Sequence, residues 1–147
     1  MNQNLPIAET GVQLIGSDMA IAKYSLTALD CLDPVALANF YAKITDFEVV
    51  VAHRDKHGNP HWVELVDNGV TRIAFQRVEK YIPPTWPEGP TPQQAHLDFD
   101  VADLNKAEQQ LLEIGAVKSP IQTSSNPETN FRVYFDPAGH PFCLVCI

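Results

Sequence analysis

The chain is poor in cysteine, in basic residues and in long hydrophobic runs, and each shortage excludes a class of protein. Its 147 residues include three cysteines, an odd number that fits a reduced, cytoplasmic protein better than a secreted disulfide framework. Ten lysines and arginines against eighteen aspartates and glutamates give a net charge of −8, so nucleic acids and anionic membranes are not expected partners. No apolar run approaches the roughly 20 residues that a bilayer span needs.

The remaining composition is that of one globular domain, with 45% hydrophobic and 19% charged residues. Residues 1–21 lack hydrophobic periodicity and are interpreted as an N-terminal extension or tag, which leaves open whether residues 1–18 are native. No basic segment followed by a long apolar one marks a secretory signal. The domain is therefore expected over residues 22–147, with a small organic molecule as its partner.

Two similar stretches of sequence follow one another in this domain. In residues 22–78, Asp33-Pro34 predicts the start of a helix over 34–45, by an N-cap followed by proline at the first helical position. Strands are expected on both sides of that helix, at Ser25–Cys31, Phe47–Val51, Trp62–Val66 and Thr71–Val78.

Residues 94–147 repeat this order. Ala95–Val101 alternates polar and apolar residues, a helix is expected over 103–114, and strands are expected at Phe131–Phe135 and Phe142–Val145. Shifts of 69 or 70 residues superimpose the two stretches, which indicates two tandem β-α-β-β-β modules. We expect an α+β fold in which one curved mixed sheet carries both helices on one side and encloses a ligand cup on the other.

The connection at residues 79–93 holds five of the twelve prolines and is predicted to be irregular and stiff. It is either a plain linker or a lid over the cup.

Several segments together resemble a known family. They are Leu29–Tyr41, Ala74–Val78 followed by Pro83–Pro87, His96-Leu-Asp98, and Asp136-Pro-Ala-Gly-His-Pro-Phe142. In combination they are similar to the glyoxalase-like branch of the vicinal oxygen chelate superfamily, which includes glyoxalase I, extradiol dioxygenases, and fosfomycin- and bleomycin-resistance proteins. The resemblance covers residues 22–147 and implies that the ligand lies in the cup.

The resemblance also implies where a divalent metal would be held: by a His from the first strand and a Glu or His from the last strand of each module. His96 matches one such position, while the others fall on Thr27 or Leu26, on Ala74 and on Cys143. We therefore expect no metal and no other cofactor. A divalent metal is the less favoured alternative, with Glu64, Gln76, Asp98 or Cys143 as unusual ligands.

His96 is the candidate catalytic residue, as a general acid or base, or else a hydrogen-bonding wall of the cup. The candidate ligand-binding residues are Trp62, Glu64, Arg72, Gln76, Trp86, Asp98, Arg132, Tyr134 and Cys143. Arg72 either points inward or is a solvated edge residue, and Trp62 either stacks on a ligand or is buried. Arg132 and Tyr134 face the cup if Phe131, Val133 and Phe135 face the helices.

Other histidines and cysteines are given structural interpretations. Cys143 and Cys146 are three residues apart on a strand and so point to opposite faces, which does not suit a shared zinc ion. His53, His57 and His61 are interpreted as solvated and His140 as a turn residue.

Two classes of function remain. The first is a small-molecule-binding protein of the bleomycin-resistance type, whose cup lacks the family's metal site. The alternative is a lyase, isomerase or dioxygenase with an atypical metal site or with His96 as acid/base. The resemblance and the apolar last strand favour a homodimer, and a pure interaction module has no positive signal beyond the acidic surface.

Overall fold

The structure, a computed structural model, describes residues 21–122 and 129–147. The extension over residues 1–21 therefore lies almost wholly outside the described residues. The first module consists of β1 (Thr27–Cys31), α1 (Pro34–Thr45), β2 (Glu48–Arg54), β3 (Pro60–Asp67) and β4 (Val70–Arg77). Its sheet has the order β1-β4-β3-β2, with β1 parallel to β4 and the other neighbours antiparallel.

The second module repeats this topology. It consists of β5 (Leu97–Val101), α2 (Leu104–Glu113), β6 (Val117–Lys118), β7 (Phe131–Phe135) and β8 (Pro141–Cys146), with sheet order β5-β8-β7-β6. The two-residue strand β6 supplies the strand after the helix that the repeat requires, at a position that the sequence analysis did not assign. The tandem β-α-β-β-β architecture and the α+β class are confirmed.

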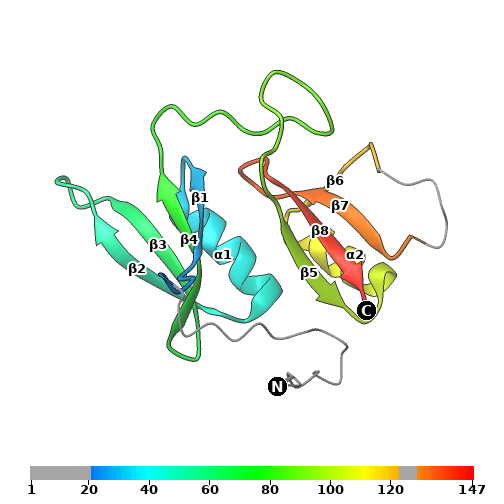
Figure 1. Cartoon of the computed structure of the whole chain (residues 1–147), viewed down its shortest axis with the longest axis horizontal. Coiled ribbons are helices and arrows are strands. Elements are labelled where there is room, and N and C mark those ends of the chain that lie inside the picture. The colour runs from blue at the N-terminus through cyan, green and yellow to red at the C-terminus, as the bar shows by residue number, and fades with distance from the viewer. Residues whose placement is uncertain (1–20, 123–128) are drawn as a thin grey trace, which may run out of the picture.

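The expectation of one continuous curved sheet needs correction. The described strands form two four-stranded sheets, and every strand pairing joins neighbours within one module. Figure 1 shows the two sheets side by side, with the connection from β4 to β5 running between them. The modules therefore meet through side chains rather than through a shared ladder of backbone hydrogen bonds.

Both helices begin where the sequence places a capping aspartate. Asp33 accepts hydrogen bonds from the backbone N–H groups of Val35 and Ala36, and α1 ends at Asp46 in the left-handed conformation. Asp103 caps α2 in the same way through the N–H groups of Asn105 and Lys106. The helix expected over 103–114 is one residue shorter at each end.

One aromatic cluster joins the two modules. The ring of Tyr41, on α1, stacks on Phe75 of β4 and on Phe99 of β5, and meets Phe142 of β8 edge-on. Tyr41, Phe75 and Phe142 are fully buried, and the same core extends to Leu111 of α2. Both helices therefore pack into one hydrophobic core shared by the two modules.

The opposite sides of the two sheets, here called the open faces, carry the alternate residues of each strand. In the first sheet Ala28 of β1 pairs with Ala74 of β4, and in the second Asp98 of β5 pairs with Cys143 of β8. Because side chains alternate along a strand, these residues point away from the core formed by Phe75 and Phe99. These are the faces on which the sequence analysis expects the ligand to bind.

Most of strand β8 is covered within the chain, but its tail is not, since Ile147 is 86% exposed. The strand lies between β5 and β7, and its residues from Pro141 to Leu144 are buried within the chain. The exposed apolar tail that the sequence argument for a dimer used is therefore present, and the dimer itself stays a prediction. Among the described helices, neither is long and apolar enough to cross a membrane.

Candidate functional site

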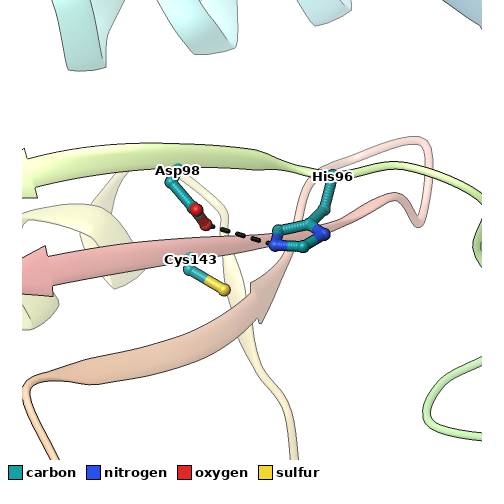
Figure 2. Close-up of side chains that lie close together, drawn as sticks. All are labelled: His96, Asp98 and Cys143. Atoms are coloured by element: carbon teal, nitrogen blue, oxygen red, sulfur yellow. Dashed lines mark ion pairs between the residues drawn. The ribbon is translucent and has the colours of Figure 1, made fainter. Parts of the chain in front are cut away.

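A cluster of three polar side chains occupies the open face of the second module. His96 is the residue before β5, and Asp98 lies within that strand. Cys143 comes from β8, directly opposite Asp98 (Figure 2). His96 Nε2 lies 3.4 Å from Asp98 Oδ1, and one ligand atom of each of the three residues lies within 4.8 Å of the others. The side chains of His96 and Asp98 are 41% and 55% exposed, so the cluster is open to solvent.

The environment of Cys143 keeps its thiol protonated at neutral pH. Burial, followed by a hydrogen bond to Asp98 and the negative charge of that carboxylate, raises the pKa of Cys143 to about 12. A protonated thiol is a poor nucleophile, so this environment does not favour a nucleophilic role for Cys143. Cys146 points to the opposite side of β8, where its thiol contacts the carbonyl of Ala102, as expected from the spacing.

A second polar cluster lies on the open face of the first module. The carboxylate of Glu64, on β3, accepts a hydrogen bond of 2.9 Å from the indole N–H of Trp62 and one of 2.8 Å from the hydroxyl of Thr71. Gln76 of β4 lies opposite Trp62 in the ladder. Trp62 is therefore half-buried beside a carboxylate rather than part of the core.

The register of the sheets shows which first-module residues correspond to the second-module cluster. Leu26 stands one residue before β1, as His96 stands one residue before β5. The pair Ala28–Ala74 likewise corresponds to the pair Asp98–Cys143. Of the two residues that the sequence left open, Leu26 rather than Thr27 is the counterpart of His96.

This correspondence tests the metal site that the resemblance implies. Leu26 and Ala74 offer no donor atom, so a site that takes ligands from both modules does not fit these residues. The nitrogen, oxygen and sulfur donors of His96, Asp98 and Cys143 do converge, and they fit a three-ligand site within one module. Asp98 is the donor that the family positions do not include.

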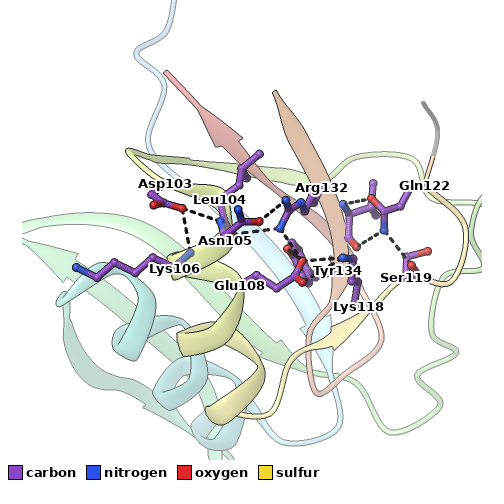
Figure 3. Close-up of polar contacts among 11 residues, drawn as sticks. Asp103, Leu104, Asn105, Lys106, Glu108, Lys118, Ser119, Gln122, Arg132 and Tyr134 are labelled. Carbon is purple, nitrogen blue, oxygen red and sulfur yellow. Dashed lines mark hydrogen bonds and ion pairs between the residues drawn. The ribbon is translucent and has the colours of Figure 1, made fainter. Parts of the chain in front are cut away.

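The expectation that Arg132 and Tyr134 face the cup is wrong. Figure 3 shows both side chains pointing to α2, where Glu108 accepts a hydrogen bond of 2.7 Å from Tyr134 and forms a 3.1 Å ion pair with Arg132. Lys118 of β6 completes this cluster, 2.9 Å from Glu108. The apolar side chains that alternate with them along β7 occupy the open face instead, opposite Cys143.

Arg72 and Trp86 are engaged elsewhere. Arg72 forms a 3.1 Å ion pair with Asp67 across the β3–β4 turn, and its side chain is half exposed, which matches the solvated-edge interpretation. The indole of Trp86 donates to the carbonyl of Ile121, which attaches the proline-rich connection to the second module. Neither Arg72 nor Trp86 therefore belongs to the Glu64 cluster of the first module or to the Asp98 cluster of the second.

Sequence reasoning missed a buried polar network at the β7–β8 turn. The Asp136 side chain is 0% exposed; it accepts hydrogen bonds of 2.8 Å from the phenol of Tyr41 and from His140 Nδ1. His140 Nε2 lies 3.0 Å from the hydroxyl of Tyr81, in the connection between the modules. A cavity of about 240 Å³ adjoins it, lined by Cys31, Leu37, Tyr81 and Pro83 among others.

Comparison with known proteins agrees with the observed architecture. The family model described as a glyoxalase-like domain matches residues 27–145, nearly the whole described chain. No curated protein matches the sequence.

Solved structures with the same fold have little sequence in common with this chain. The fosfomycin resistance protein FosX from Listeria monocytogenes has a TM-score of 0.61 at 15% identity, covering 87% of this chain and 93% of its own. TnmS3, an antibiotic binding protein from Streptomyces, has a TM-score of 0.53 at 20% identity, covering 87% and 98%. A glyoxalase/bleomycin resistance protein/dioxygenase family enzyme from Burkholderia phytofirmans has a TM-score of 0.58 at 17% identity, covering 84% and 97%.

Proposed function

Because the chain belongs to the glyoxalase-like domain family, we propose that it binds a small organic molecule on the open faces of its sheets, without a metal site shared by both modules. The observation that carries this proposal is the contrast between the modules. The second presents His96, Asp98 and Cys143, whereas the corresponding first-module positions are the apolar Leu26, Ala28 and Ala74. An imidazole beside two further polar groups on one face, and an indole beside a carboxylate on the other, suit an organic ligand with a polar end and a flat apolar part.

Two residues supply the specific contacts in this proposal. Trp62 offers a large flat surface for an aromatic or aliphatic part of the ligand, and Glu64 holds the indole in place through its hydrogen bond. His96, which is 41% exposed, is accessible to the polar end of the ligand. Neighbours with this fold include an antibiotic binding protein and a fosfomycin resistance protein, so antibiotics are suitable first compounds to test.

The assembly and the compartment belong to the same proposal. The resemblance supports a homodimer, which sedimentation at tens of micromolar tests, since a stable interface persists in that range. Cys31, Cys143 and Cys146 are all free thiols, which supports a reducing, cytoplasmic compartment.

The test is native mass spectrometry of the full chain purified from cells. We expect a small molecule that leaves on denaturation and that, added back, quenches Trp62 fluorescence in a Trp86→Phe background. His96→Ala should weaken its binding by about tenfold, the loss of one hydrogen bond, and Asp100→Asn is the matched control on the same strand. A chain that retains no molecule, and whose Trp62 fluorescence bleomycin and fosfomycin leave unchanged, would contradict the proposal.

The alternative is an enzyme, a lyase, isomerase or dioxygenase, and one observation favours it: three potential metal ligands converge around His96. The same experiment separates the two functions. A binding protein returns the recovered compound unchanged, whereas an enzyme converts it to a product of different mass or chromatographic mobility, and His96→Ala abolishes that conversion.

A further inference from the structure

We propose that His96, Asp98 and Cys143 form a binding site for Zn²⁺ within the second module alone. The proposal goes beyond the small-molecule function and does not depend on it. It concerns three side chains on adjacent strands of one sheet, with no contribution from the first module or from a second copy of the chain.

The geometry of the strands brings the three donors together. His96 and Asp98 are two residues apart and therefore lie on the same face, and Cys143 is the direct partner of Asp98 in the parallel β5–β8 ladder. One ligand atom of each lies within 4.8 Å of the others, and His96 Nε2 is already 3.4 Å from Asp98 Oδ1. Bonds of about 2.0–2.3 Å to a tetrahedral zinc ion place the donors about 3.3–3.8 Å apart, so side-chain rotations have to bring the most separated donors closer by about 1 Å.

The chemistry of the donors favours zinc over harder cations. An imidazole nitrogen, a carboxylate oxygen and a thiolate sulfur are all ordinary zinc ligands, and three protein ligands with one open position is the pattern of sites that bind a further molecule. A thiolate disfavours Mn²⁺ and Mg²⁺, which prefer oxygen ligands. Neither β5 nor β8 contains a lysine or arginine that would compete with the cation.

Binding requires one proton transfer and no redox step. The thiol proton of Cys143 passes to the solvent as the zinc–sulfur bond forms, because the thiolate is the form that binds the ion. Because His96 and Asp98 are 41% and 55% exposed, the ion exchanges with solvent and a chelator removes it. A reversible site of this kind is compatible with a chain that carries no stoichiometric metal after purification.

The test is titration of the chelator-treated full chain with Co²⁺, which replaces Zn²⁺ and reports its ligands by absorption. We expect a saturable near-ultraviolet band from charge transfer between thiolate and Co²⁺, which Zn²⁺ abolishes and an equal concentration of Mn²⁺ leaves in place. Cys143→Ser should remove the band, and Asp98→Asn or His96→Ala should weaken Co²⁺ binding by about tenfold or more.

Two matched variants control for unspecific effects. Cys146→Ser removes a thiol from the other side of the same strand, and Asp100→Asn removes a carboxylate that pairs with Val145 instead of Cys143. Both should keep the band. Circular dichroism of each variant shows that it is folded. If the wild-type chain gives no band, or the band survives in folded Cys143→Ser, or Asp98→Asn binds Co²⁺ as tightly as Asp100→Asn does, the proposal is wrong.

Discussion

The hydroxyl of Tyr41 donates a hydrogen bond of 2.8 Å to Oδ2 of Asp136, which links α1 of the first module to the β7–β8 turn of the second. The Tyr41 ring also stacks on Phe75 of the first sheet and on Phe99 of the second, so this one side chain contacts both modules. Asp136 in turn binds His140, which contacts Tyr81 of the connection. This turn therefore joins all three parts of the chain, away from the open faces.

Tyr41→Phe tests the polar part of this link. The ring contacts remain, but Asp136 loses one of its donors while staying buried, and we expect the free energy of unfolding to fall by about 1–2 kcal/mol. Urea unfolding at pH 7 measures the change. An unchanged midpoint would show that the hydroxyl contributes nothing to the contact between the modules.

Asp136→Asn should lower the free energy of unfolding further than Tyr41→Phe does, by about 3 kcal/mol. The reason is that the buried carboxylate accepts hydrogen bonds from Tyr41, from His140 and from two backbone N–H groups. The amide of asparagine turns a donor toward groups that are themselves donors. Asp67→Asn is the control, since it breaks a partly exposed ion pair with Arg72 and should change stability by less than about 1 kcal/mol. Equal effects of the two substitutions would contradict the prediction.

Cys31 predicts a loss of stability in alkaline solution. Burial, and then the nearby charges of Asp136, Asp33 and Asp30, raise the pKa of Cys31 from 9.0 to about 12. Between these values the unfolded chain releases a proton that the folded chain retains, so the stability contributed by this thiol falls as pH rises. The expected slope is about 1.4 kcal/mol per pH unit for one proton.

The difference between wild type and Cys31→Ala isolates this thiol from other groups. Urea unfolding at pH 8, 9 and 10 should show a shallower decline for Cys31→Ala, whatever its stability at pH 7. Parallel curves for the two proteins would show that Cys31 does not titrate differently in the folded state.

Glu108 predicts a complementary loss in acid. Burial disfavours its charge, but hydrogen bonds from Lys118, Tyr134 and Arg132 outweigh burial and lower its pKa below the usual 4.5. The stability that this carboxylate contributes is present above pH 4.5 and is lost as pH falls through the lower, folded-state value. Glu108→Gln should reduce the free energy of unfolding at pH 7 by about 1–2 kcal/mol. The variant's free energy of unfolding should also decline less steeply than that of the wild type below pH 4.5.

Arg132→Met separates this structural role from ligand binding. The long apolar side chain keeps the packing against α2 but removes the ion pair with Glu108, so stability should fall modestly. Binding of the compound recovered in the mass-spectrometric experiment should stay within twofold of wild type. A loss of binding as large as that of His96→Ala would place Arg132 in the site after all.

Local sequence signals determined the elements of this protein. Asp33-Pro34 and Asp103 start the two helices because a side-chain oxygen next to free backbone N–H groups acts within a few residues. The alternation of Ala95–Val101 likewise placed His96 and Asp98 on one face, since the strand period is a local property. The repeat of these signals was enough to predict two β-α-β-β-β modules, and several short segments together carried the glyoxalase-like resemblance.

Only the tertiary structure decided which residues from different elements meet. The pattern of polar and apolar residues along β7 predicted that Arg132 and Tyr134 face the cup. In the structure both side chains instead bind Glu108 of α2. The register of β5 against β8 places Cys143 opposite Asp98, and packing of the modules brings Tyr41 to Asp136, 95 residues away. Such pairings depend on strand order and on the burial of charge between elements, and no local pattern encodes either.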